Sequence, residues 1–257
     1  MPTLSIVLLC LAGFVAAFVD SIAGGGGMIS IPAFIMAGVP PHLTLGTNKF
    51  SATANSLTSS IRYIQEGKVN WNLLGVLVPF SLVGAFFGVR TVIAIPTLYL
   101  RFVITGMILL VGIYTVRKKT LGQIQEIKNP NSLQWFLGAF FALLIGFYDG
   151  FFGPGTGSFL MFMFIKGFGL DFLHAGGNAR VLNFISNAVS LVLFALHGKI
   201  WYAVGIPVAV AMFFGALAGS RTAFRKGIAF IRPLFIVITF LAALKLLIDA
   251  VQFLWKG

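Results

Sequence analysis

The sequence predicts an all-α fold: a polytopic transmembrane helical bundle of two inverted-topology repeats. Of its 257 residues, 58% are hydrophobic and only 9% are charged, whereas an average soluble domain has about 25% charged residues. The apolar stretches are long and continuous rather than alternating, which is typical of membrane-spanning helices and not of a membrane barrel. The second half of the chain also repeats the first.

This repeat is regular along most of the chain. At a constant offset of 131 residues, Lys49, Phe50, residues 66–69, Gly84, Gly88, Arg90 and Arg101 recur as Arg180, Val181, residues 197–200, Gly215, Gly219, Arg221 and Arg232. Upstream, Asp20 and the run 24–27 recur as Asp149 and the run 153–157 at an offset of 129. A repeat of this length in a hydrophobic chain is typical of transporters whose site lies where the two halves meet.

Each apolar stretch predicts one helical element. The stretches are 3–19, 28–39, 43–61, 71–89, 98–116, 133–148, 158–170, 181–196, 201–219 and 229–254. Several approach the about 20 residues that a spanning helix needs. The stretches 28–39 and 158–170 are shorter, so we expect half-helices or re-entrant segments there, each following a glycine-rich break.

The basic residues predict the domain organisation and the topology. They concentrate in two loops, which we place in the cytoplasm: Arg117, Lys118, Lys119 and Lys128, then Arg221, Arg225, Lys226 and Arg232. The first repeat is therefore expected over 1–119, a cytoplasmic linker over 120–132, and the second repeat over 133–257. Equivalent loops of the two repeats then fall on opposite sides of the membrane, so the repeats are inverted. This holds provided that the segments 3–19 and 28–39 together cross the membrane an even number of times.

Composition also excludes several classes of function. The net charge of +12 does not indicate a nucleic-acid partner, because the charges lie in the predicted cytoplasmic loops. The single cysteine, Cys10, excludes an internal disulfide, and His42, His174 and His197 lack the spacing of a metal site. No cofactor is expected. The apolar N-terminus lacks a basic region and a convincing cleavage site, so we expect it to be retained.

The two glycine-rich breaks are the first candidate for a site. Four glycines in a row cannot continue a stable helix, and Pro154 interrupts the second run. The short helices after the breaks would meet near the midplane in an inverted pair, with N-terminal N–H groups that suit an anion. The alternative interpretation is that these glycines only allow helices to pack closely and bind no substrate. The candidate substrate-binding residues here are Gly24, Gly25, Gly26, Gly27, Gly153, Gly155, Thr156 and Gly157.

Two equivalent cations are the second candidate. Lys49 and Arg180 each follow a polar element within an apolar segment, where a charge is expensive and is normally paired or functional. They could hold an anionic substrate, or they could extend to the nearer surface. The neighbouring candidates are Thr47, Asn48, Asn178 and Asn183, on polar helix faces that equally could serve helix packing. The equivalent Asp20 and Asp149 are expected to be counter-ions to the cations or proton carriers.

Other motifs are assigned to structure. We interpret Gly84 with Gly88, and Gly215 with Gly219, as helix-packing motifs. Lys245 and Asp249 lie four residues apart on the last predicted helix and are expected to pair locally.

Together these residues resemble the sulfite exporter TauE/SafE family. The resemblance rests on the run 24–27 followed by Pro32, on Gly46-Thr47-Asn48-Lys49 with its Ser- and Ala-rich helix, and on weaker second copies. It covers roughly 5–250. It implies a multi-pass permease of the bacterial cytoplasmic (inner) membrane that carries sulfite, sulfoacetate or related organosulfonates. The second copy departs from the pattern at Pro154 and at 177–180, and these positions bear on which anion is carried. The expected partners are this anion and the lipid bilayer, and a homodimer is left open.

Three other functions are alternatives. A cation or proton-coupled transporter would use Asp20 and Asp149, although fixed cations nearby would repel a cation. An intramembrane aspartyl protease would use Asp149 with Asp171, after Tyr148 and a Gly-x-Gly element. A catalytic dyad must share one site, and Asp171 has no equivalent in the first half. A structural membrane scaffold is the third rival, but it would not need matched polar breaks.

Overall fold

A computed structural model of the chain describes residues 2–97, 99, 100 and 130–226. These residues form helices joined by short links, with no strand among them. The all-α prediction is therefore confirmed for this part of the chain. Most of the predicted helix over 98–116, most of the linker over 120–132, the helix over 229–254, and the pair Lys245 and Asp249 lie outside the described residues.

Five described helices are long and apolar enough to cross a membrane. They are α1 (Thr3–Ala23), α4 (Trp71–Ala94), α6 (Ser132–Phe151), α8 (Phe172–Leu196) and the helix Tyr202–Lys226. Each agrees in position with a predicted apolar stretch. The protein is thus built as a multi-pass membrane bundle.

The helix α3 (Pro41–Gln65) differs from its prediction as an apolar stretch. It is long enough to span a membrane, but most of its buried side chains carry hydroxyl, amide or charged groups. A helix with such a face must be enclosed by other helices, because lipid cannot satisfy polar groups. Its position inside the bundle, packed against α8, meets this requirement.

The helix α8 begins nine residues before the predicted stretch 181–196. Its start is fixed by Asp171, whose carboxylate accepts hydrogen bonds from the N–H groups of Leu173 and His174. Asp171 is therefore an N-cap. The glycines, Asn178 and Arg180 within residues 176–180 hid this start from a hydropathy argument. Arg180 consequently lies two turns inside the helix.

Helices α3 and α8 end alike. After each helix a glycine takes a positive φ, +65° at Gly67 and +63° at Gly198. The next N–H, of Lys68 or Lys199, bonds to a carbonyl five residues back. This is the Schellman ending that glycine favours, and it explains why the turns 66–69 and 197–200 recur in the sequence.

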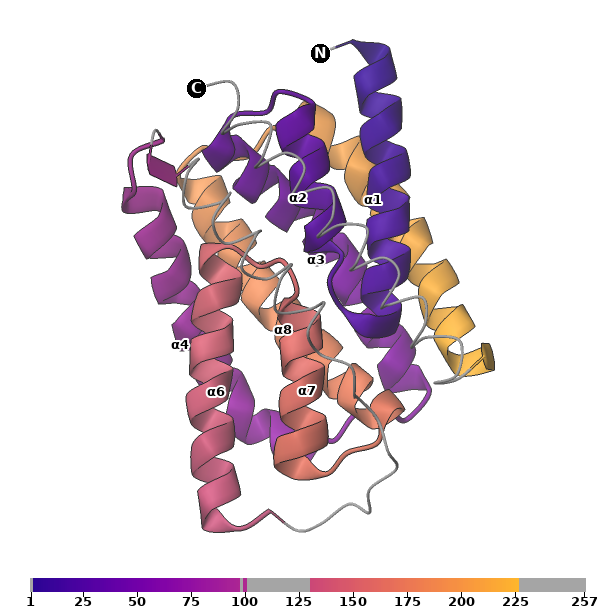
Figure 1. Cartoon of the computed structure of the whole chain (residues 1–257), viewed down its shortest axis with the longest axis vertical. Helices are drawn as coiled ribbons and strands as arrows, with labels where there is room; N and C mark the ends of the chain where they lie inside the picture. Colours follow the sequence, from indigo (N-terminus) through magenta and orange to yellow (C-terminus); the bar gives the residue numbers. More distant parts are fainter. Residues whose placement is uncertain (1, 98, 101–129, 227–257) are drawn as a thin grey trace, which may run out of the picture.

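Two short helices follow the glycine-rich runs. Helix α1 ends at Ala23 and α2 (Gly27–Met36) begins four residues later, while α6 ends at Phe151 and α7 (Thr156–Phe168) begins five residues later. Each short helix packs against the long one before it. Figure 1 shows α1 and α2 reaching into the bundle from the end where the N-terminus lies, and α6 and α7 from the opposite end.

The helix pair α3 and α8 runs antiparallel through the bundle. Gly46, near the start of α3, lies against the carbonyl of Lys199, which follows α8. Gly177, near the start of α8, lies against the carbonyl of Lys68, which follows α3. The beginning of each helix therefore meets the end of the other.

Glycines bring the outer helices into close contact. A Cβ on Gly84 or Gly88 of α4 would lie 2.1 Å from a carbonyl oxygen of α6. A Cβ on Gly215 or Gly219 would lie 2.3 Å from a carbonyl oxygen of α1. The interpretation of both motifs as packing motifs is confirmed, because a side chain at these positions would overlap the neighbouring backbone.

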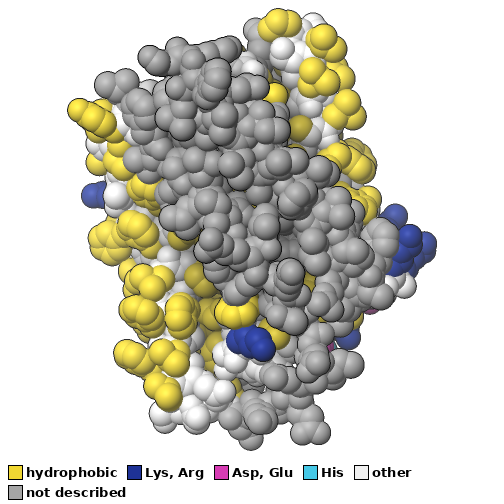
Figure 2. Space-filling model, viewed as in Figure 1, with side chains coloured by type: hydrophobic (Ala, Val, Ile, Leu, Met, Phe, Trp, Pro, Cys, Tyr) yellow, Lys and Arg dark blue, Asp and Glu magenta, His cyan; other side chains and the backbone are white. Residues whose placement is uncertain are grey.

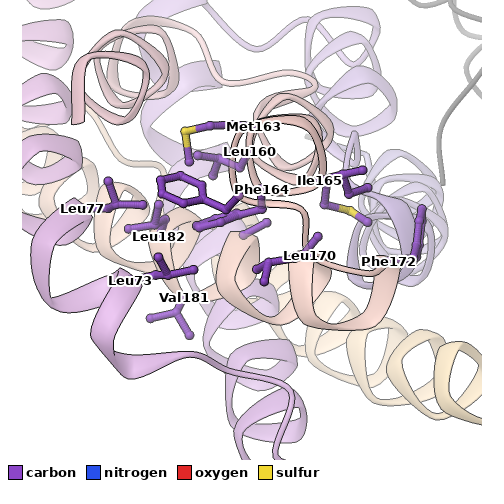
Figure 3. Packing of buried hydrophobic residues seen from close by; sticks show 14 of the residues in the cluster. Leu73, Leu77, Leu160, Met163, Phe164, Ile165, Leu170, Phe172, Val181 and Leu182 are labelled. Carbon is purple, nitrogen blue, oxygen red and sulfur yellow. The ribbon is translucent and has the colours of Figure 1, made fainter. Parts of the chain in front are cut away.

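An apolar core joins α4, α7 and α8. Figure 3 shows Leu73 and Leu77 of α4, Phe164 of α7 and Leu182 of α8 packed together in one cluster. All four side chains are buried. This cluster fixes the short helix α7 against two long helices, so the residues preceding α7 are held in place.

The outer surface of the described helices is apolar. Large exposed side chains include Leu4 and Leu8 of α1, Phe87 of α4, and Phe136 and Phe140 of α6. Figure 2 shows hydrophobic side chains over the left flank and the upper right of the described surface, whereas Lys and Arg side chains gather in a few separate places. Such a surface suits contact with lipid tails.

Candidate functional site

The site lies where the two glycine-rich runs touch. A Cβ on Gly24 would lie 2.3 Å from the backbone nitrogen of Ser158, and one on Gly27 would lie 3.0 Å from Cα of Pro154. The hydroxyl of Ser158 also donates to the carbonyl of Ala23, 3.1 Å away. Residues 134 apart in the sequence are thus in backbone contact, which only glycine permits at Gly24, where φ is +80°.

Asp20, near the end of α1, is held by four donors. One carboxylate oxygen accepts from the N–H groups of Gly25 and Gly26, at 2.9 and 3.0 Å. The other accepts from Asn55 Nδ2 at 2.8 Å and from Arg180 Nη1 at 3.0 Å. Its buried charge is therefore fully compensated.

Asp149, the equivalent residue near the end of α6, is held mainly by side chains. Its Oδ1 lies 2.9 Å from Nζ of Lys49. Its Oδ2 accepts a hydrogen bond from the hydroxyl of Ser186 and a longer one, of 3.4 Å, from Asn183. Pro154 stands where Gly25 stands in the first half and has no N–H to donate.

The ion pairs therefore cross between the halves of the chain. Lys49 of the first half pairs with Asp149 of the second, and Arg180 of the second half pairs with Asp20 of the first. Both pairs are buried. The structure brings these four predicted residues together as counter-ions.

A small cavity of about 30 Å³ lies between the ion pairs. A cavity needs roughly 10–15 Å³ by this measure to hold one water molecule, so only a few waters fit. Nine of the sixteen predicted site residues line it: Asp20, Gly26, Gly27, Asn48, Lys49, Asp149, Gly153, Gly157 and Asn183. The lining combines charged, amide and hydroxyl side chains with apolar ones, and the described residues contain no metal-ligating cluster.

Seven predicted site residues do not line the cavity: Gly24, Gly25, Thr47, Gly155, Thr156, Asn178 and Arg180. Thr47 instead accepts a hydrogen bond from the backbone of Trp201, and Asn178 accepts one from the backbone of Asn70. Arg180 lies behind the lining and is fully buried. Gly25 and Gly26 direct their N–H groups at the protein's own carboxylate rather than at a free anion.

Sequence reasoning missed several residues of the lining. Ser30 lies one turn into α2 and donates to Asn48 at 2.6 Å. Asn187 accepts from Nζ of Lys49 at 2.9 Å, and Asn55 bonds to Asp20. Both asparagines lie on the polar helix faces, so the sequence contained a signal for them. Ala16, Ala17, Ala52 and Met212 also line the cavity, but no sequence pattern marks them as site residues.

The structure contradicts the aspartyl-protease alternative. Asp149 is bound to Lys49, whereas Asp171 caps α8 and contacts the ring of His174. The two carboxylates serve different sites and cannot form a dyad. His174, to which no function was assigned, thus has a structural role.

A multi-pass helical bundle with charged side chains around a cavity between its helices is typical of a membrane transporter. The family model of the sulfite exporter TauE/SafE matches residues 9–246. The chain belongs to this family.

Several bacterial relatives match over nearly their whole length. A "Probable membrane transporter protein ORF9" of Sinorhizobium sp is 36% identical over 98% of this chain and 97% of its own length. A "Probable membrane transporter protein" of Haemophilus influenzae is 34% identical, over 95% of this chain and 94% of its own. The Escherichia coli K12 protein YfcA, also named a probable membrane transporter, is 34% identical over 95% and 90%. No solved structure shows a significant match.

These relatives and the apolar helices place the protein in the bacterial inner membrane as a multi-pass transporter rather than an enzyme. The resemblance drawn from residues 24–27 and 46–49 is confirmed at the level of the family.

Proposed function

We propose that the protein moves small sulfur-containing anions, such as sulfite, sulfoacetate or related organosulfonates, across the cytoplasmic membrane, and that it exports them by alternating access. The family description, sulfite exporter, supports the substrate class. Within the site, the observation that carries the proposal is the ammonium of Lys49, a cationic donor that lines the cavity together with amides, a hydroxyl and the carboxylates of Asp20 and Asp149.

The chemistry of the lining fits an oxyanion. Nζ of Lys49 has three donors and is bonded to Asp149 and Asn187. The amides of Asn48, Asn55 and Asn183 also line the cavity and supply donors for further oxygens. Hydrogen bonds from charged donors are the strong ones in such sites. A substrate larger than a few waters requires a wider form of the cavity, which alternating access supplies.

We also propose that the two halves are inverted repeats with re-entrant half-helices. Equivalent residues make reciprocal contacts: Gly46 with Lys199 and Gly177 with Lys68. The equivalent helices α3 and α8 run antiparallel, and the hairpins α1–α2 and α6–α7 start from opposite ends (Figure 1). These observations favour a two-fold axis in the membrane plane over one along its normal, and they support repeat boundaries near 1–119, 120–132 and 133–257.

A second candidate keeps the transporter class but changes the cargo. Asp20 and Asp149 also line the cavity, so a cation could replace Lys49 or Arg180 at a carboxylate. Against this, both carboxylates already have a fixed cationic partner.

Thermal unfolding of the detergent-purified protein tests the proposal. A ligand that binds only the folded state raises the melting temperature. We expect sulfite or a sulfonate to raise it, with sulfate, acetate and Na⁺ or K⁺ salts as the comparison. Loss of the shift in Lys49→Ala is expected. A shift with cations alone would favour the second candidate, and equal sulfonate binding after Lys49→Ala would exclude the proposed site.

A further inference from the structure

The two buried ion pairs differ in access to the cavity. Lys49 and Asp149 both line it, so a ligand there can touch either member. Asp20 lines it as well, but its partner Arg180 does not and is fully buried. An anion in the cavity can therefore compete with Asp149 for Lys49, whereas it cannot reach the guanidinium of Arg180 in this conformation.

The two carboxylates also differ in what remains if the cation is taken away. Without Arg180, Asp20 keeps two backbone N–H donors and Asn55. These donors favour the ionised form. Without Lys49, Asp149 keeps the hydroxyl of Ser186 and the long contact to Asn183. A buried carboxylate with so few donors and no counter-ion takes up a proton.

We propose that Asp149 is the proton-binding residue of a coupled transport cycle, in which an anion displaces it from Lys49 and a proton from water then neutralises it. This inference rests on the proposed anion function and extends it. The step is balanced: one monovalent anion and one proton enter, the ion pair of Lys49 with Asp149 breaks, and the ammonium pairs with the anion. The net charge of the site does not change.

The surroundings of Asp149 are consistent with this assignment. The ionisable groups that face it are Lys49 from α3, Asp20 across the cavity from α1, with Arg180 of α8 behind it, and Tyr148 beside it on α6. The phenol of Tyr148 donates to the carbonyl of Pro154. Helices α4 and α7, which also pack on α6, bring no charged side chain to the cavity lining. When the ion pair with Lys49 breaks, the carboxylate of Asp149 therefore has no other counter-ion in contact among the described residues.

Coupling of this kind makes the transport of a monovalent anion electroneutral. The direction of net movement then follows the combined gradients of anion and proton rather than the membrane potential. Export requires an outward anion gradient that exceeds any opposing pH gradient.

The first arm of the test measures binding with methanesulfonate, a monovalent anion that stays ionised between pH 5 and about 8 because sulfonic acids are strong acids. Binding to the purified full-length protein should tighten about tenfold per pH unit as the pH falls, with uptake of about one proton per anion. In Asp149→Asn, binding should persist without pH dependence and without proton uptake. Binding to the wild type without proton uptake would overturn the inference and leave the anion site intact.

The second arm needs no ligand. In Lys49→Met, the infrared carbonyl stretch of a protonated carboxylic acid should appear at neutral pH and vanish in Lys49→Met/Asp149→Asn. The matched control, Arg180→Met, should show no such band, since Asp20 retains its backbone donors. An ionised Asp149 in Lys49→Met would overturn the inference. If the expected band appears but neither the wild type nor any variant binds methanesulfonate, the result would support a protonatable Asp149. It would then count against the proposed sulfonate substrate.

Discussion

Gly46 of α3 lies directly against the backbone carbonyl of Lys199, where a Cβ would be 2.0 Å from the oxygen. The equivalent Gly177 of α8 lies against Lys68, with a corresponding distance of 2.2 Å. No side chain fits at either position without moving a backbone. These two contacts set how closely α3 and α8 approach at both ends of the pair, and the cavity is lined from both helices between them.

Alanine at either glycine is expected to destabilise the fold. Overlap of this kind typically costs about 1–3 kcal/mol, and thermal unfolding in detergent measures it. Gly75→Ala in α4 is the matched control, because nothing lies within 4 Å of its Cβ position. There alanine should leave stability unchanged or raise it by up to about 1 kcal/mol. Equal effects of Gly46→Ala and Gly75→Ala would contradict the close contact.

The buried pair of Arg180 with Asp20 predicts a large effect of removing one partner. Arg180→Met leaves the carboxylate of Asp20 without its cation, which typically costs about 3–5 kcal/mol. Adding Asp20→Asn should recover part of this loss, because the uncompensated charge is gone. Arg225→Met, at an exposed position, is the control. Thermal unfolding of the wild type, Arg180→Met, Asp20→Asn and the double variant measures the coupling. The prediction would be contradicted if the losses of the two single variants simply added in the double variant.

The helices could be predicted from sequence because long apolar stretches are decided locally. The start of α8 was missed since the glycines, Asn178 and Arg180 interrupt the apolar pattern there, although Asp171 is an N-cap residue type that marks such a start. The polar face of α3 was predicted as a binding or helix-packing face. The packed helices show how much of that face is buried, which no pattern within the helix itself determines.

The candidate site could be predicted only in part. Lys49, Asp149, Asp20 and Arg180 were identified because charges in apolar segments demand partners. Which carboxylate pairs with which cation depends on residues that are 100 and 160 positions apart, and no local pattern carries that information. The same holds for Thr47 and Asn178, whose polar side chains fit a binding site equally well but hold backbone N–H groups instead.

The N-cap of α8 predicts a pH dependence of stability. The pKa of Asp171 is lowered: partial burial alone would raise it, but hydrogen bonds from His174 and Leu173 outweigh burial. A carboxylate with a lowered folded-state pKa stabilises the fold above its unfolded pKa of about 3.9, and this stabilisation is lost as the pH falls through the folded value. The difference in melting temperature between wild type and Asp171→Asn should therefore be present near neutral pH and be lost as the pH falls through the lowered folded-state pKa of Asp171. A difference that grows as the pH falls would contradict this assignment.

Thr47 and Asn178 predict opposite effects on access to the cavity. Thr47 Oγ1 accepts from the N–H of Trp201 at 2.9 Å, and Asn178 Oδ1 accepts from the N–H of Asn70 at 3.0 Å. The two contacts lie near opposite ends of the antiparallel pair α3 and α8. We expect each contact to hold the bundle closed over the cavity at its own end.

Removing one contact should favour opening at that end. Thr47→Val and Asn178→Ala each lose a hydrogen bond worth about 1 kcal/mol, or roughly fivefold in population. A cysteine placed at Ala52, which lines the cavity, reports the opening in a Cys10→Ser background. A membrane-impermeant maleimide should label it faster from the outer side in Thr47→Val and from the cytoplasmic side in Asn178→Ala, following the topology predicted from loop charge. Thr91→Val, on the exposed face of α4, should leave both rates unchanged. Faster labelling from the same side in both variants would show that the two contacts do not close opposite ends.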